Sequence, residues 1–164
     1  MPAQDVVRRR IEAQGFRGLD DAALTEVGPW LRWSPAVCAM FMAIGTILAS
    51  AAMLWTLATI ALLGALMPMH PFDLIYNHAV RYLTGTRPLP HHGPQRRFAC
   101  GVGAAWLTST GIAFNQGSPV LGYFLGGALT VVATLAATTQ FCVASFIYNA
   151  IFRSTVGASA ARVA

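Results

Sequence analysis

The chain has 164 residues, of which 55% are hydrophobic and 10% are charged. Soluble domains carry about 25% charged residues, so this composition excludes an ordinary water-soluble domain and indicates a membrane protein. All 11 basic residues are arginine, and they exceed the six acids to give a formal net charge of +5. The arginines flank hydrophobic segments and form no basic groove with interleaved aromatic residues, so we expect contacts with the lipid bilayer and no nucleic-acid partner.

Residues 1–32 form an amphipathic N-terminal segment in which hydrophobic and charged residues alternate. Asp20 is a favourable N-cap for a short helix that follows it. Trp30, Arg32 and Trp33 then come directly before the first hydrophobic block, where amphipathic rings settle at a membrane surface. We expect this segment to lie on the cytoplasmic face of the membrane.

The first hydrophobic block has 40 residues without a formal charge, between Arg32 and Asp73. It predicts a helical hairpin over 33–69, with helices at about 35–49 and 52–66 that end before two prolines. Both helices are shorter than the roughly 20 residues that cross a bilayer, which indicates tilt, local thinning or shielding by neighbouring protein. A single long tilted helix is the alternative.

Residues 70–97 form a connector that is rich in histidine, proline and arginine, with an interfacial helix followed by an extended loop. A second block, 55 residues without a charge before Arg153, predicts a hairpin over 98–153. Its first helix ends near Asn115, and a turn over 116–119 precedes a helix whose apolar pattern continues to Phe152. Residues 154–164 are expected to form a flexible tail.

An internal match supports this division. Ile75-Tyr76-Asn77 followed by Arg81 recurs 72 positions later as Ile147-Tyr148-Asn149 followed by Arg153, each time after a hydrophobic hairpin. Because two crossings separate the copies, they face the same side and predict a parallel repeat of hairpin plus interfacial helix. The fold class is therefore an all-α polytopic membrane protein with four transmembrane helices.

The distribution of charge predicts the orientation in the membrane. If all four helices cross, every arginine lies on one side and both hairpin turns are uncharged. By the positive-inside rule, both termini and the connector lie in the cytoplasm of a bacterium, and the chain lies in its inner membrane. We expect these residues at the membrane interface: Trp30, Arg32, Trp33, Tyr76, Arg81, Arg96, Arg97, Tyr148 and Arg153.

Three segments resemble a small bacterial integral-membrane family that is known only as a domain of unknown function. They are Pro71-Phe72-Asp73-Leu74-Ile75-Tyr76, Arg97-Phe98-Ala99 and Phe141-Cys142-Val143-Ala144-Ser145. The resemblance runs from about Ser34 to Arg153 and implies paired hydrophobic hairpins. The last segment matches an aromatic-Cys-x-x-Cys signature, but Ser145 stands where the family has its second cysteine. The resemblance implies a fold and no established activity.

Cys142 is the sharpest candidate for chemistry. A helix would place Ser145 on the same face, where its hydroxyl can donate to a Cys142 thiolate in a monothiol site. Cys38 and Cys100 lie early in helices that begin at the cytoplasmic side, so three thiols at one depth could hold a soft metal or accept sulfur. The plainer interpretation is that each cysteine is a small apolar residue in a helix contact.

Other residues favour packing over catalysis. Small residues predict close contact between the third and fourth helices: Gly101, Ala105, Gly122, Gly126 and Gly127. The predicted crossings contain no histidine and no ionisable residue at mid-membrane, which argues against a bound haem or chlorin and against an ion-coupled transporter. We therefore predict no cofactor and no catalytic centre, apart from the candidate thiols.

Two functions remain open at this point. The first is a non-catalytic accessory or scaffolding subunit beside a larger inner-membrane complex, an electron-transfer or photosynthetic one, with a membrane-protein partner or a homo-oligomeric state. The alternative is a membrane thiol-redox or sulfur-handling protein that uses Cys142. A small pore or carrier, the third possibility, requires a water-lined path that the sequence does not show.

Overall fold

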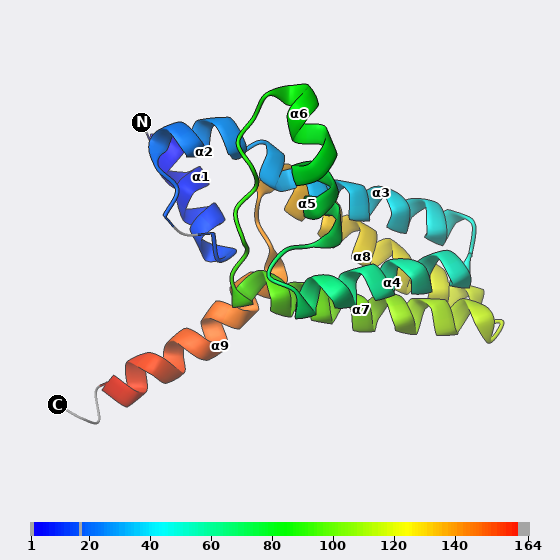
Figure 1. Cartoon of the computed structure of the whole chain (residues 1–164). Coiled ribbons are helices and arrows are strands. Elements are labelled where there is room, and N and C mark those ends of the chain that lie inside the picture. Colours follow the sequence, from blue (N-terminus) through cyan, green and yellow to red (C-terminus); the bar gives the residue numbers. More distant parts are fainter. Residues whose placement is uncertain (1, 17, 161–164) are drawn as a thin grey trace.

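The computed structural model describes the backbone of residues 2–16 and 18–160, and side chains within 5–16 and 18–152. In this part every regular element is helical, and the helices are joined by turns and loops (Figure 1). In chain order the elements are α1 (Pro2–Ala13), α2 (Asp21–Val27), the 3-10 turn η1 (Trp30–Arg32), α3 (Trp33–Ile47), α4 (Ala51–Leu66), α5 (Pro71–Ile75), the π-helical turn η2 (Tyr76–Val80), α6 (Arg81–Thr84), α7 (Pro94–Asn115), α8 (Pro119–Thr139) and α9 (Val143–Ala160).

The first hydrophobic block folds as a hairpin, as predicted. α3 and α4 follow the expected ranges closely, and the single long helix considered as an alternative is wrong. The turn is tight: Ala49 has a positive φ of 47°, and the Ser50 hydroxyl accepts a hydrogen bond of 3.4 Å from Met53 N at the start of α4. A side-chain cap after a left-handed residue reverses the chain within three residues.

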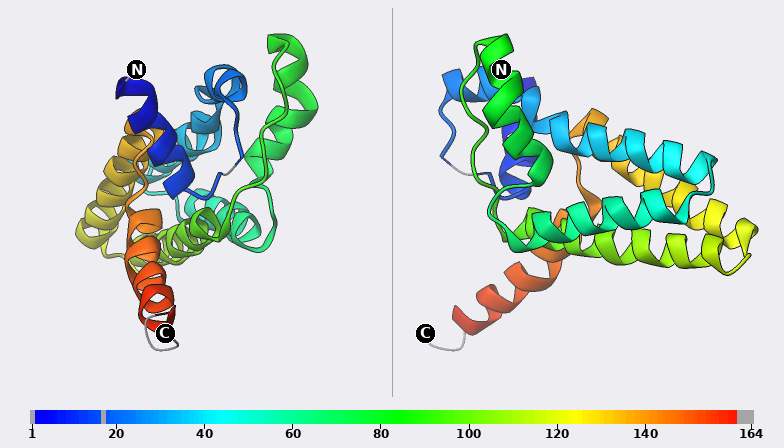
Figure 2. Two further views of the ribbon diagram at one scale, coloured as in Figure 1. Left: turned by 90° about the vertical axis from the view of Figure 1, so that its left-hand side faces the viewer. Right: turned by 45° about the vertical axis from the view of Figure 1, so that its right-hand side comes forward.

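The second hairpin consists of α7 and α8, joined through Gly117 with a φ of +74°. The expected continuous helix to Phe152 is wrong, because α8 ends at Thr139 and Gln140 adopts a left-handed conformation with a φ of +56°. The Gln140 side chain donates a 2.8 Å hydrogen bond to Gly28 O, which holds this break against the N-terminal segment. α9 then projects away from the bundle, and its helix extends to Ala160 within the expected tail (Figures 1 and 2).

Two apolar clusters lie at different levels of the molecule. In the four-helix bundle, α7 packs along α4 and α3 packs along α8, around Met42, Leu54, Leu57, Ala58, Ala61, Ala104, Leu107 and Leu129. A second cluster joins α1, α2 and η1 to the connector and contains Ile11, Phe16, Leu24, Val27, Leu31, Tyr76 and Leu89. We call residues 2–32 and 70–93 together the headpiece. It lies at one end of the bundle, and the hairpin turns lie at the other (Figure 2).

Asparagines of the repeated Ile-Tyr-Asn motif have similar roles in both copies. Asn77 pairs its side-chain amide with the backbone of Leu89, at 3.2 Å and 2.7 Å, and so holds the connector loop. Asn149 donates a 2.8 Å hydrogen bond to Ala13 O at the end of α1. Each copy thus fastens a neighbouring segment, although the first lies in α5 and η2 and the second in α9.

The structure distinguishes among the small residues expected at helix contacts. A Cβ on Gly126 would collide with Thr46 of α3, and one on Gly122 would lie 2.5 Å from Phe114 of α7. A Cβ on Gly101 would lie at ordinary contact distance, 3.8 Å from the Cβ of Ala65 in α4. Ala105 is exposed, and a Cβ on Gly127 would meet no atom of the described chain within 4 Å. Gly126 therefore fits α8 against α3, a contact that the sequence does not identify.

Candidate membrane spans are fewer than four by length and hydropathy. Among the described residues, Trp30–Ile47 and Pro119–Thr139 each qualify, and α4 qualifies with Pro71–Thr84 as a pair bent by 81°. α7 is long enough, but it begins with Gln95, Arg96 and Arg97, which lowers its apolar character. Two or three apolar helices thus support membrane association, whereas four crossings remain a prediction.

We expect Gly126→Ala to destabilise the bundle and Gly127→Ala to leave it unchanged. Adding a methyl group in a filled contact costs about 1–3 kcal/mol, whereas the Gly127 position has open space. Thermal unfolding of both variants in the same detergent measures the difference. Equal melting temperatures for the two variants would contradict the assigned α8–α3 contact.

Candidate functional site: the headpiece end of the bundle

Buried polar side chains gather where the bundle meets the headpiece. Each is at most 7% exposed, although the surroundings are largely apolar: Ser34, His70, Asp73, His92, Gln95 and Arg96. They come from the start of α3, the α4–α5 junction, the end of the connector and the start of α7. Burial of a polar group costs free energy unless the group is paired, so the pairing in this layer constrains how the headpiece packs on the bundle.

Arg96 lies at the centre of this polar layer. Its Nη2 donates to the Ser34 hydroxyl and lies 3.6 Å from Asp73 Oδ2, while its guanidinium group stacks 5.0 Å from the centre of the Phe16 ring. One cation therefore contacts α3, α5 and the N-terminal segment. Its Nη1 and the Asp73 Oδ1 have no hydrogen-bond partner within the described chain.

Arg96 and Tyr76 were both expected at the membrane interface, and the structure instead buries them. Tyr76 is 0% exposed, because its ring packs between Trp30 and Trp33 and its hydroxyl contacts the Thr86 hydroxyl at 2.6 Å. Arg96 is buried because it occupies the face of α7 that meets Asp73. The polar atoms of Arg96 and Tyr76 bind partners inside the protein. Residue type alone therefore did not show whether these side chains lie at the membrane interface or in the interior.

The remaining residues expected at the interface are half-buried or exposed. Arg97 lies one position after Arg96 on another face of α7, and it donates to the last carbonyls of α4, Ala65 O at 2.8 Å and Leu66 O at 2.7 Å. Trp33 donates to Phe72 O at 3.1 Å, and Arg81 stacks on Tyr82. Trp30 and Arg32 are half-buried, Tyr148 packs against Phe98, and the side chain of Arg153 lies outside the described part.

Two histidines of the polar layer are buried close to Arg96. His70 Nδ1 accepts a 3.3 Å hydrogen bond from Phe72 N, which leaves Nε2 as the protonated nitrogen, 4.0 Å from the Cys38 sulfur. His92 has no hydrogen-bond partner on either ring nitrogen in the described chain. Burial, reinforced by Arg96, lowers the pKa of His92 to about 4 and that of His70 to about 3.

The three cysteines come together at this end of the bundle. Cys38 belongs to α3, Cys100 to α7, and Cys142 immediately precedes α9; all are half-buried free thiols. The Cys38 sulfur lies 4.0 Å from His70 Nε2, and Cys100 lies within electrostatic range of Cys38 and of Cys142. We call His70, Cys38, Cys100 and Cys142 together the thiol row.

Cys142 lies in the break between α8 and α9. Its carbonyl accepts a 3.0 Å hydrogen bond from Phe146 N, the first turn of α9, while the Ser145 hydroxyl donates to Gln95 O at 3.4 Å. Ser145 is therefore engaged with α7 and does not donate to the Cys142 thiol as expected. Sequence reasoning missed this because it assumed one uninterrupted helix; Gln140, a lone polar residue in an apolar run, was the available signal.

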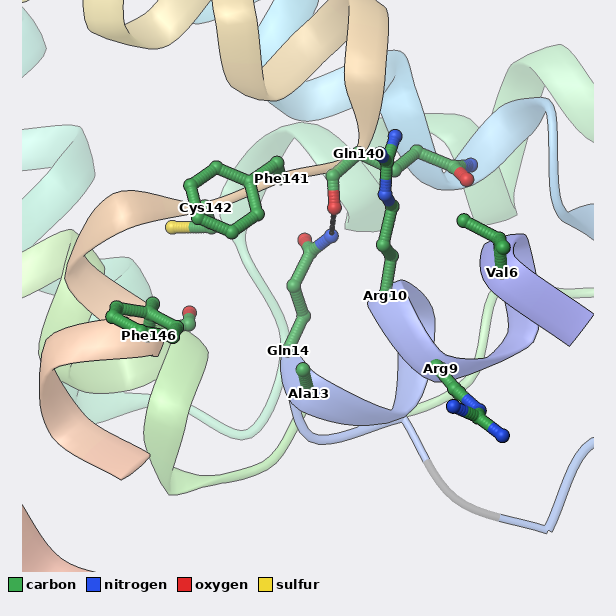
Figure 3. A pocket seen from close by; sticks show the side chains of 10 residues that line it. Val6, Arg9, Arg10, Ala13, Gln14, Gln140, Phe141, Cys142 and Phe146 are labelled. Carbon is green, nitrogen blue, oxygen red and sulfur yellow. Dashed lines mark hydrogen bonds between the residues drawn. The ribbon is translucent and has the colours of Figure 1, made fainter. Parts of the chain in front are cut away.

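Cys142 also lines a pocket of about 200 Å³ between α1 and this break. Figure 3 shows the Cys142 sulfur pointing away from Arg10, and the hydrogen bond of 2.6 Å from Gln14 Nε2 to Gln140 O across the pocket. The other lining residues are Val6, Arg9, Ala13, Phe141, Ser145 and Phe146. In the part of the chain that the structure describes, no three His, Cys, Asp or Glu side chains are arranged to hold a metal ion.

We expect Arg96→Met to destabilise the fold by about 3–5 kcal/mol, because it leaves the Asp73 carboxylate buried without its cation. The matched control is Arg87→Gln, which breaks an ion pair of 3.2 Å with Glu26 at the surface and should cost at most about 1 kcal/mol. Thermal unfolding in detergent compares them. Similar losses for both variants would mean that Arg96 does not organise the junction.

Stability should fall as the pH is lowered from about 6.5 toward 4. In this window the unfolded chain protonates His92 while the folded chain keeps it neutral, so unfolding takes up protons and acid favours it. His70, whose pKa is lowered to about 3, takes up a proton on unfolding in the same window. His92→Gln therefore removes one of two contributions and should reduce the dependence of the melting temperature on pH without abolishing it. His91→Gln, at an exposed neighbour, is the control and should keep the wild-type slope; equal slopes for the wild type and His92→Gln would contradict the assignment.

Comparison with known proteins gives a family and no activity. No curated protein and no solved structure matches the chain. The family model described as a domain of unknown function, DUF4395, matches residues 29–153, which include the whole helical bundle and the thiol row. The chain therefore belongs to the DUF4395 family.

Proposed function

We propose that this chain is a four-span protein of the bacterial inner membrane, with both termini and the connector in the cytoplasm. Two antiparallel hairpins support this proposal, because their turns carry no charge and lie at the end opposite the headpiece (Figure 1). The arginines whose side chains are described belong to the headpiece or to the start of α7. Such a one-sided distribution of positive charge fits the positive-inside rule.

The short first hairpin fits this proposal if the bilayer adapts to it. α4 has 16 residues, which gives a length of about 24 Å at 1.5 Å per residue, less than the roughly 30 Å of a hydrocarbon core. α7 packs along α4, and Arg97 extends from α7 to the final carbonyls of α4. Because α7 is longer and Arg97 binds those carbonyls, α7 shields α4 from the mismatch between its length and the thickness of the bilayer.

Within this fold, thiol chemistry at the cytoplasmic end is the function that the geometry supports best. The observation that carries it is the thiol row: Cys38 contacts His70, Cys100 lies within electrostatic range of Cys38 and Cys142, and Cys142 lines a pocket. This proximity favours the alternative expected from sequence, a membrane thiol protein centred on Cys142.

The proposed step is thiol–disulfide exchange with a cytoplasmic disulfide carrier. The Cys142 thiolate attacks one carrier sulfur, forms a mixed disulfide, and releases the other carrier sulfur as a thiolate. Cys100 then passes its proton to the carrier thiolate released in the first step and attacks the Cys142 sulfur, which releases the second carrier sulfur and leaves a Cys100–Cys142 disulfide. Two electrons pass from the cysteine pair to the carrier, and a cytoplasmic dithiol reverses both steps.

Reaction of inverted membrane vesicles with a soluble aromatic disulfide tests this proposal. The wild type should release two equivalents of aromatic thiolate, and Cys100→Ser should stop at a mixed disulfide after one. Cys142→Ser should react at least tenfold more slowly, because the remaining thiols belong to the bundle helices α3 and α7 and do not line the pocket. Cys38→Ser is the matched control and should still release two equivalents; absorbance and intact-protein mass measure each outcome.

Equal reaction of Cys142→Ser and the wild type would overturn the thiol proposal. Right-side-out vesicles should not react with an impermeant disulfide, so rapid reaction from that side would overturn the orientation. These two results are independent, since the first compares variants and the second compares faces of one membrane.

The accessory-subunit role is a second candidate, and α8 favours it. Only 11% of this apolar helix is buried within the chain, and it leaves Val120, Leu121, Phe124, Val131 and Leu135 exposed. Lipid or a neighbouring membrane protein, such as a subunit of an electron-transfer or photosynthetic complex, would cover this face. A stoichiometric partner retained in mild detergent, together with unchanged assembly of Cys142→Ser, would support this role over thiol chemistry.

A further inference from the structure

The pocket beside Cys142 has an apolar interior that is open at the end of a membrane helix. Its walls include Val6 of α1 and Phe141 and Phe146 at the α8–α9 break, which are 48%, 43% and 60% exposed. Phe141 and Phe146 pack together with ring centres 5.9 Å apart. A water-soluble ligand gains little from such walls, whereas a hydrocarbon chain is stabilised by them.

Two arginines without a carboxylate partner flank this apolar surface. Arg10 Nη1 donates a 2.8 Å hydrogen bond to Thr139 O at the end of α8, and Arg9 extends outward on α1 (Figure 3). Elsewhere in the described chain, Arg8, Arg87 and Arg96 form ion pairs with Asp21, Glu26 and Asp73. The acids of α1, Asp5 and Glu12, are exposed. With two arginines beside it, the rim of the pocket carries positive charge.

The walls of the pocket are held in place before any ligand binds. Gln14 Nε2 donates to Gln140 O at 2.6 Å, and Gln140 Nε2 donates to Gly28 O at 2.8 Å. At the end of α1, Asn149 Nδ2 donates to Ala13 O at 2.8 Å. These hydrogen bonds fix α1 against the break, so that a ligand finds a formed site and pays less to order it.

We propose that this pocket binds an acidic phospholipid of the cytoplasmic leaflet. An acyl chain lies against Phe141 and Phe146, and the phosphate lies at the guanidinium group of Arg10, with Arg9 adding to the positive charge of the rim. Apolar walls at the end of α8 and positive charge at the rim match a lipid with a negatively charged headgroup. The site rests on the proposed placement of this end at the cytoplasmic surface, and it does not require thiol chemistry.

Native mass spectrometry of the full chain, released from nanodiscs that contain equal amounts of phosphatidylglycerol and phosphatidylcholine, tests the site. We expect the wild type to retain one phosphatidylglycerol. Arg9→Gln with Arg10→Gln should weaken its retention roughly 30-fold, because each arginine near an acidic lipid contributes about a factor of five. The control removes two arginines that form ion pairs, Arg8→Gln with Arg87→Gln, and should retain the lipid.

Two further measurements keep the result unambiguous. Phe146→Ser should also lose the lipid, while 10 mM inorganic phosphate, on the order of a cytoplasmic level, should not displace it from the wild type. Displacement by phosphate would overturn the proposal in favour of a free-anion site. Equal retention of both lipids, or equal loss in the control pair, would overturn it as well. Cys100→Ser, outside the pocket lining, should keep the lipid while it loses the second thiol-exchange step, which separates this test from that of the thiol function.

Discussion

The buried guanidinium group of Arg96 is the interaction on which the arrangement of the molecule depends. It contacts Ser34, Asp73 and the ring of Phe16, and these residues belong to α3, α5 and the N-terminal segment. Removing one partner of a buried ion pair leaves an uncompensated charge, so none of these elements can move alone without a large cost. Arg96 thereby fixes the position of the headpiece on the bundle.

The position of the thiols follows from this junction. Asp73 holds α5 against α7, and α5 begins at His70, which caps the helix and turns its Nε2 toward Cys38. Cys100 lies one helical turn after Arg96 on α7 and so faces the same layer. The polar layer and the thiol row are thus neighbours that share His70. The two buried histidines stay neutral because burial and the charge of Arg96 oppose their protonation.

The positions of most helices could be predicted from the sequence, whereas the contacts between helices could not. Charge-free blocks and turn residues located α3, α4 and α7, and Asp20 caps α2 through a 2.6 Å hydrogen bond from Ala23 N, as expected. Hydropathy does not distinguish an arginine that faces lipid headgroups from one that pairs internally, which is why Arg96 was misplaced. The break at Gln140 depends on a hydrogen bond to Gly28, 112 residues earlier in the chain, and no local pattern encodes such a contact.

The break at Gln140 has a further consequence for Cys142. A continuous helix would have carried Cys142 past the bundle, whereas the break keeps it near Cys100 and in the lining of the pocket, with its sulfur pointing away from Arg10. A lipid chain in that pocket would lie against Cys142. Access of a soluble carrier to the thiol row would then depend on the acidic lipid content of the membrane, since both compete for the same wall.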